Sequence, residues 1–157
     1  MIKRSDIIFE RVNIQKLIFV MMMIISTLLI MNYGIPAIFS NNQSSGINEK
    51  NIDILLNGSI GWLPVLLFKF SLVVLGPVIE EIYFRGIMFE EAQTLGKFVQ
   101  IVWPTVIFSA IHFPLTLEQW VTYSVAGGML MLVRVLTKRL QYSIIFHILH
   151  NFIVLVS

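Results

Sequence analysis

The chain alternates long apolar runs with short polar segments. The apolar runs cover residues 17–40, 54–75, 98–113, 120–136 and 143–156. A helix needs about 20 apolar residues to cross the hydrocarbon core of a bilayer, so the last run is short for a span. We therefore expect an all-α fold, a polytopic transmembrane helical bundle with about five membrane segments.

The composition supports a membrane protein. Of the 157 residues, 57% are hydrophobic and only 13% are charged, whereas a soluble domain carries about 25% charged residues. The net charge of +2 is small, and nothing in the sequence suggests a nucleic-acid partner. The absence of cysteine excludes disulfides, a thiolate nucleophile and cysteine-ligated metal. Membrane lipid is the expected environment, and the composition leaves the oligomeric state open.

Basic residues predict the orientation of the chain in the membrane. Residues 1–16 carry four of them, as is typical of a cytoplasmic or interfacial segment. A secretory signal is the alternative, but the apolar run that follows is longer than a signal core. Lys97 and three basic residues at 134–139 fall on the same predicted side, whereas the outer polar loop at 41–53 holds only Lys50. This bias predicts a cytoplasmic N-terminus. The residue usage suggests a bacterial plasma membrane.

Two adjacent carboxylates, Glu80 and Glu81, follow a long apolar run and precede Arg85. Ionisable groups are costly in a membrane and are usually paired or functional there. In a helix, Glu81 and Arg85 are four residues apart on one face and form an ion pair. Glu80 lies about 100° around the helix from Glu81. We therefore expect a structural pair, Glu81 and Arg85, beside a carboxylate that faces elsewhere.

The three histidines all lie in or at the edge of apolar runs. His147 and Asn151 are four residues apart and share a helix face, while His112 comes from another segment. Any one membrane histidine is often only a polar contact between helices, which is how we interpret the extra His150. Together, Glu80, His112, His147 and Asn151 suggest hydrolysis: a glutamate base, imidazoles that hold water and an amide that stabilises an oxyanion.

A metal site is the competing arrangement. Glu80, His112 and His147 could bind a divalent ion such as zinc and leave one coordination position open. The sequence contains no His-Glu-x-x-His, which is the usual helical zinc-protease motif. Spacing alone does not decide between acid–base chemistry and a metal, so the cofactor is either absent or one divalent metal.

The order of these residues resembles a known family. Glu80-Glu81-x-x-x-Arg85, then Phe108-x-x-x-His112, then His147-x-x-x-Asn151 is similar to the three motifs of the CPBP family. These are the CAAX-protease and bacteriocin-processing intramembrane endopeptidases, also called the abortive-infection family. The resemblance covers roughly residues 62–156. It implies three parts: an N-terminal segment at 1–16, a first transmembrane helix and polar loop at 17–61, and a protease core at 62–157.

The resemblance also implies roles for single residues. Glu80 activates water, His112 works with it, His147 and Asn151 support the oxyanion, and Glu81 pairs with Arg85. Family members remove a tripeptide after a prenylated cysteine, mature bacteriocins or provide self-immunity to them, and they have been described both as glutamate proteases and as metalloproteases. We therefore expect a peptide or lipopeptide substrate. The alternative is a membrane immunity protein that binds a partner and cleaves nothing.

Overall fold

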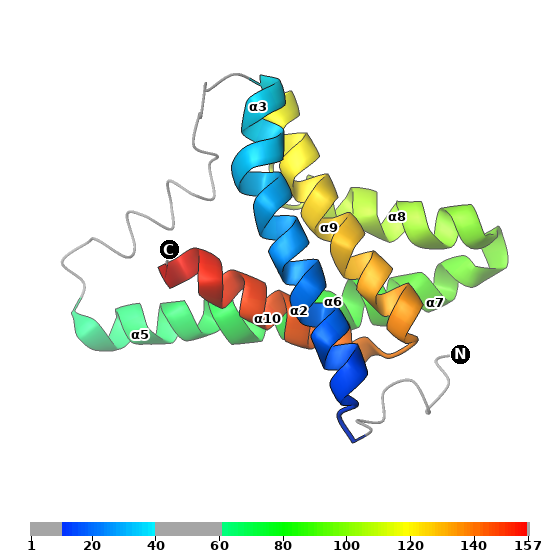
Figure 1. The fold of residues 1–157 in the computed structure, drawn as a ribbon, viewed down its shortest axis with the longest axis horizontal. Coiled ribbons are helices and arrows are strands. Elements are labelled where there is room, and N and C mark those ends of the chain that lie inside the picture. Colours follow the sequence, from blue (N-terminus) through cyan, green and yellow to red (C-terminus); the bar gives the residue numbers. More distant parts are fainter. Residues whose placement is uncertain (1–10, 40–60, 157) are drawn as a thin grey trace.

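The computed structural model describes residues 11–39 and 61–156, and every regular element in these ranges is helical (Figure 1). Residues 1–10 of the predicted N-terminal segment at 1–16, and the predicted polar loop at 41–53, lie outside the described residues. The elements in chain order are α2 (Ile14–Leu29), η1 (Ile30–Gly34), α3 (Ile35–Phe39), α5 (Trp62–Phe70), η2 (Ser71–Leu75), α6 (Gly76–Glu81), η3 (Ile82–Met88), α7 (Phe89–Glu91), η4 (Ala92–Leu95), α8 (Lys97–Ala110), α9 (Leu117–Thr137) and α10 (Leu140–Val156). The predicted all-α fold is confirmed.

Several of these elements join end to end. Within the described ranges, three helices are long and apolar enough to cross a membrane: Ile14–Phe39, Trp62–Leu95 and Leu117–Thr137. Two more are apolar but shorter, α8 with 14 residues and α10 with 17. The predicted five apolar segments are therefore present, but they differ in length more than the sequence indicated.

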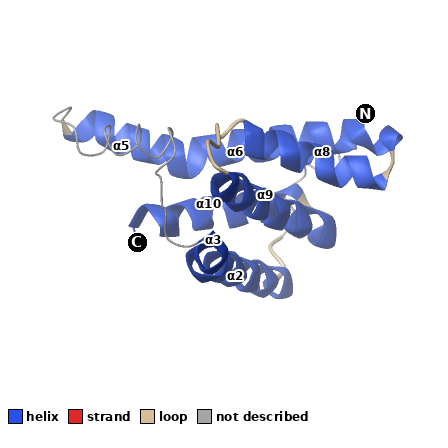
Figure 2. Cartoon of the chain, turned by 90° about the horizontal axis from the view of Figure 1, so that it is seen from above, coloured by secondary structure: helices blue, strands red, loops and turns tan. Residues whose placement is uncertain are grey.

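The helices run in two crossing directions. Helices α2 and α9 run side by side, and the long helix from α5 to α7, with α10, crosses them (Figure 1). In the perpendicular view, α9 and α10 lie between α2 on one side and the α5–α7 helix on the other (Figure 2). Their shared core contains Val20, Ile24, Phe84, Phe108, Leu130, Val133, Tyr142 and Phe146.

Helix α2 is an integral part of this core. Val20 and Ile24 are at most 1% exposed. At the start of the helix, the Asn13 backbone N–H donates to the Tyr142 hydroxyl at 2.9 Å, and Lys16 Nζ donates to Thr137 O at 3.0 Å. These contacts fix the first helix onto the turn between α9 and α10.

The outer surface is apolar. Large hydrophobic side chains stand well exposed, among them Trp62 and Phe98, each 77% exposed, and Ile79 at 66%. Monomeric soluble proteins rarely expose contiguous apolar surface on this scale, and such surface marks contact with a membrane or a partner. The protein is a multi-pass membrane protein.

Two widened, π-helical segments flank α6. In η2 the Gly76 N–H donates to Ser71 O, five residues back rather than four. Pro77 follows and has no N–H to donate. The sequence left open whether Pro77 kinks the helix or starts a new one. The structure continues one helix through it, because the widened turn accommodates the proline.

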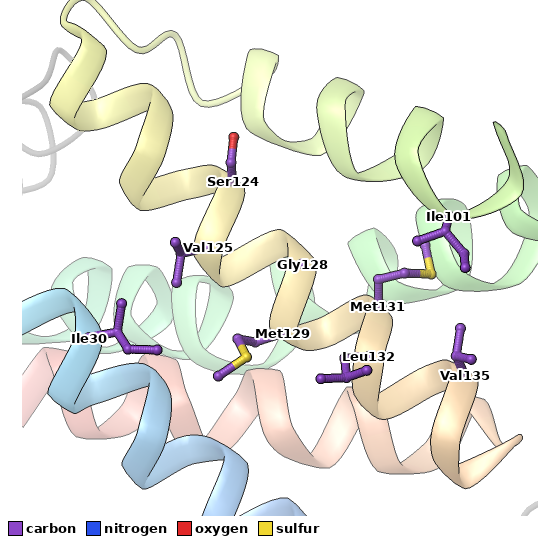
Figure 3. A pocket seen from close by; sticks show the side chains of 9 residues that line it. All are labelled: Ile30, Ile101, Ser124, Val125, Gly128, Met129, Met131, Leu132 and Val135. Carbon is purple, nitrogen blue, oxygen red and sulfur yellow. The ribbon is translucent and has the colours of Figure 1, made fainter. Parts of the chain in front are cut away.

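A groove with a volume of about 410 Å³ opens along α9 (Figure 3). Its walls come from η1, α8 and α9, through apolar residues such as Ile30, Ile101 and Leu132. None of the predicted site residues lines it. The chemistry suggested by the sequence therefore lies elsewhere, between α6, α8 and α10.

Candidate active site

Glu81 and Arg85 form a buried ion pair. Arg85 Nη1 lies 3.0 Å from Glu81 Oε1, and both side chains are fully buried. Arg85 Nη2 also donates to Gly127 O at 2.9 Å, which ties this pair to α9. A buried charge needs both a partner and further hydrogen bonds to offset its lost hydration. The arginine has both.

His147 of α10 contacts the same carboxylate. Its Nδ1 lies 3.0 Å from Glu81 Oε1. An ionised carboxylate only accepts hydrogen bonds, so Nδ1 carries the hydrogen and donates a hydrogen bond to Glu81. The opposite ring nitrogen, Nε2, lies 3.9 Å from Glu80 Oε2. Glu81 therefore orients the histidine so that Nε2 faces Glu80.

The Glu80 side chain is partly exposed, but one of its two carboxylate oxygens is buried. Its side chain is 28% exposed. Its Oε2 atom, however, is buried and has no hydrogen-bond partner among the described residues. A distance of 3.9 Å from His147 Nε2 is too long for a direct hydrogen bond, but one water molecule could bridge such a gap.

His112 follows the last turn of α8 and is held on three sides. Its Nδ1 lies 2.7 Å from Phe108 O. A carbonyl only accepts, so Nδ1 is the donor and, in the neutral ring, Nε2 carries the lone pair. The ring stacks on Tyr123 with centroids 4.6 Å apart and packs on Phe108 at 4.7 Å.

Phe108 links the two imidazoles. Its ring centroid lies 4.7 Å from that of His112 and 5.9 Å from that of His147. The Arg85 guanidinium sits 4.4 Å from the centre of the same ring, in a cation–π contact. The structure thus gathers Arg85, His112 and His147 around one phenylalanine, with Glu81 bound to Arg85 and Glu80 Oε2 3.9 Å from His147 Nε2.

Asn151 reaches a different part of the long helix. Its Nδ2 donates to Leu72 O in η2 at 3.1 Å, which occupies one of its two N–H hydrogens. The neighbouring His150 is buried and stacks parallel to Phe146. Its Nε2 has no hydrogen-bond partner among the described residues. The predicted role of His150, a polar contact between helices, stays a prediction.

The residues do not fit a metal centre. In the described ranges, no group of three or more His, Asp or Glu side chains is arranged to hold a metal ion. Glu81 and Arg85 neutralise each other, and Glu81 engages the His147 nitrogen that faces it. We therefore derive no step through a metal.

Sequence reasoning missed a second buried ion pair. Glu90 Oε1 lies 3.0 Å from Arg134 Nη2, and the glutamate side chain is 16% exposed. Arg134, expected in a polar connection, instead lies within α9 and is 5% exposed. The two residues are 44 positions apart, so no local spacing could have indicated the pair.

Gly127 allows α9 to approach Phe108 closely. A Cβ at this position would lie 2.8 Å from Phe108 Cδ1, whereas one at Gly128 would meet nothing within 4 Å. We expect Gly127→Ala to lower the free energy of unfolding by about 1–3 kcal/mol through overpacking. Gly128→Ala is the matched control and should leave stability unchanged or slightly raised. Thermal unfolding in detergent measures both, and equal midpoints would contradict this packing.

The comparisons with known proteins give one match. The family model of the type II CAAX prenyl endopeptidase Rce1-like family matches residues 61–153. Neither the curated proteins nor the solved structures gave a match. The matched stretch is more than half of the chain, and it contains both glutamates, all three histidines and the helices that bring them together. The chain belongs to the Rce1-like type II CAAX prenyl endopeptidase family, one of the CPBP intramembrane endopeptidases.

Proposed function

We propose that this protein is an intramembrane endopeptidase that hydrolyses a peptide bond with water activated by Glu80. The observation that carries the proposal is the facing pair of Glu80 Oε2 and His147 Nε2, 3.9 Å apart, with the histidine held from behind by Glu81. Family membership supports a CAAX-type intramembrane endopeptidase.

Glu80 is the general base in this proposal. It takes one proton from a water molecule while the water oxygen attacks the carbonyl carbon of the scissile bond. The same carboxyl group then gives that proton to the leaving nitrogen as the C–N bond breaks. The products are a new carboxyl terminus and a free amine. His112 accepts a hydrogen bond from the second O–H of the water through the lone pair on Nε2, and this contact keeps the water oriented.

His147 stabilises the negative charge that develops on the carbonyl oxygen. When His147 is protonated, Nδ1–H donates to Glu81 and Nε2–H is available to the oxyanion. The charges of Arg85, Glu81, His147 and Glu80 then sum to zero, as a group of low solvent exposure requires. Asn151 supplies its second N–H hydrogen to the same oxyanion.

The substrate we propose is a peptide carrying a prenyl group, which is cleaved at the membrane. The name of the matched family supports this choice. A bacteriocin-type peptide is the second substrate class, with a role in maturation or self-immunity. We place the protein in a bacterial plasma membrane with its N-terminus in the cytoplasm, because the basic residues gather on that side.

Two synthetic peptides test the function. The purified protein in lipid nanodiscs is incubated with a farnesylated peptide of the CAAX type or with its unprenylated twin, and products are mapped by mass spectrometry. We expect the farnesylated peptide to lose its last three residues. Cleavage of only an unmodified bacteriocin-type peptide would keep the endopeptidase and replace the substrate. Tight binding of every peptide without cleavage would overturn the proposal in favour of a binding protein.

A further inference from the structure

Each widened turn beside α6 contains a backbone carbonyl that accepts a hydrogen bond from a side chain of another helix. In η2, the Gly76 N–H reaches Ser71 O, and the next residue, Pro77, has no N–H for Leu72 O. Asn151 Nδ2 from α10 donates to this carbonyl at 3.1 Å.

The second widened turn repeats the arrangement. At the end of η3 the Phe89 N–H donates to Phe84 O, five residues back, and to Gly86 O, rather than to Arg85 O, four residues before it. Arg134 Nε from α9 donates to Arg85 O at 3.1 Å. The arginine is itself fixed, since Nη2 pairs with Glu90 and the guanidinium stacks over the Phe89 ring at 5.1 Å.

These turns determine where the carboxylates point. Successive residues of an α-helix are about 100° apart, so an extra residue in a turn rotates the two parts of the helix on either side of that turn relative to each other by a comparable angle. Widened turns of this kind are frequent at functional sites. The six residues of α6, which end in Glu80 and Glu81, lie between the two turns. Losing either turn would turn Glu80 away from His147.

We propose that Arg134, together with Asn151, is a positioning residue: the two side chains hold the widened turns and thereby fix the direction of Glu80 and Glu81. The proposal rests on the function given above. It adds Arg134, which belongs to none of the three motifs, and gives Asn151 a task besides the oxyanion. Arg134 acts through the Arg85 carbonyl and so touches no reacting atom.

The two variants Arg134→Gln and Arg134→Met separate this contact from the ion pair. Both lose the pair with Glu90. Glutamine places an N–H donor where Arg134 Nε stood, whereas methionine places a methyl group there. We expect Arg134→Met to have a kcat about 10–100-fold below that of Arg134→Gln, because small misplacements of reacting groups are costly. KM should change little.

Two measurements distinguish a loss of positioning from a general loss of folding. The pH profile of kcat/KM should move in Arg134→Met, because Glu80 then faces His147 differently, and should stay in place in Arg134→Gln. Amide hydrogen exchange over residues 82–91 should be faster in the methionine variant. This second readout needs no activity, so it still tests the proposal if wild-type protein cleaves neither peptide. Equal kcat, pH profile and exchange in the two variants would overturn it.

If Arg134→Met does not fold, the test moves to Arg134→Gln against wild type. A kcat within about 3-fold and an unmoved pH profile would support the carbonyl contact, since that variant keeps only this bond. A loss beyond about 10-fold would show that the Glu90 pair, rather than the carbonyl contact, is needed, and would overturn the proposal.

Discussion

Replacing Glu80 by glutamine is expected to reduce kcat for peptide cleavage by about 10²–10⁴-fold, the usual contribution of a general base. The amide keeps the size of the side chain and its exposure but cannot take a proton from water. Because the side chain is 28% exposed and, among the described residues, forms no ion pair shorter than 3.9 Å, stability should change little. Rates of product formation at saturating peptide measure the effect.

Glu91 provides the matched control for this change. It lies on the same long helix and is exposed. Glu91→Gln removes the same charge from the same helix without touching the site, and its kcat should equal that of wild type. A Glu80→Gln protein that cleaves at the wild-type rate would rule out the proposed base.

Arg85→Met is the change with the largest expected effect on stability. It leaves Glu81 as a fully buried carboxylate without its cation, and breaking a buried pair in this way costs about 3–5 kcal/mol of unfolding free energy. The Gly127 carbonyl also loses its donor. Denaturation in mixed detergent micelles, followed by circular dichroism, measures the loss.

The double variant Glu81→Met/Arg85→Met separates folding from function. Removing both charges should restore most of the stability, since apolar residues of similar size replace buried ion pairs well. Activity should not return, because His147 Nδ1 loses the acceptor that orients it. If the double variant were as unstable as the single one, the cost would lie in packing rather than in an unpaired charge.

The part of the site that follows from local spacing was predictable. The Glu81–Arg85 pair follows from a four-residue separation on a helix. The contact between His147 and Glu81 spans 66 positions, and helix periodicity says nothing about which faces of two distant helices meet. From the sequence, Glu81 is therefore predicted to pair with Arg85 alone, and His147 is predicted to share a helix face with Asn151.

The sequence could not place the motif residues at their depth in the membrane. On straight helices, His112 and His147 would sit about 10 Å apart along the membrane normal, at 1.5 Å of rise per residue. In the structure α8 and α10 are short, and both rings meet at Phe108. Sequence reasoning also assumes a regular α-helix throughout residues 62–95. It therefore does not predict η2 and η3, whose extra residues change the direction in which Glu80 and Glu81 point.

The stretch that the family model matches is shorter than the part of the chain that packs into one core. The matched stretch begins at residue 61, yet Val20 and Ile24 of α2 belong to the same buried core as Tyr142 and Phe146 of α10, and Phe146 directly precedes His147. A protein truncated to the matched stretch would lose α2, and so would expose the apolar side chains of α10 that pack against it. The helix that carries His147 would then be held less firmly. The smallest unit that folds on its own is therefore expected to be larger than the stretch that the family model matches, and α2 belongs to the scaffold that holds the candidate site.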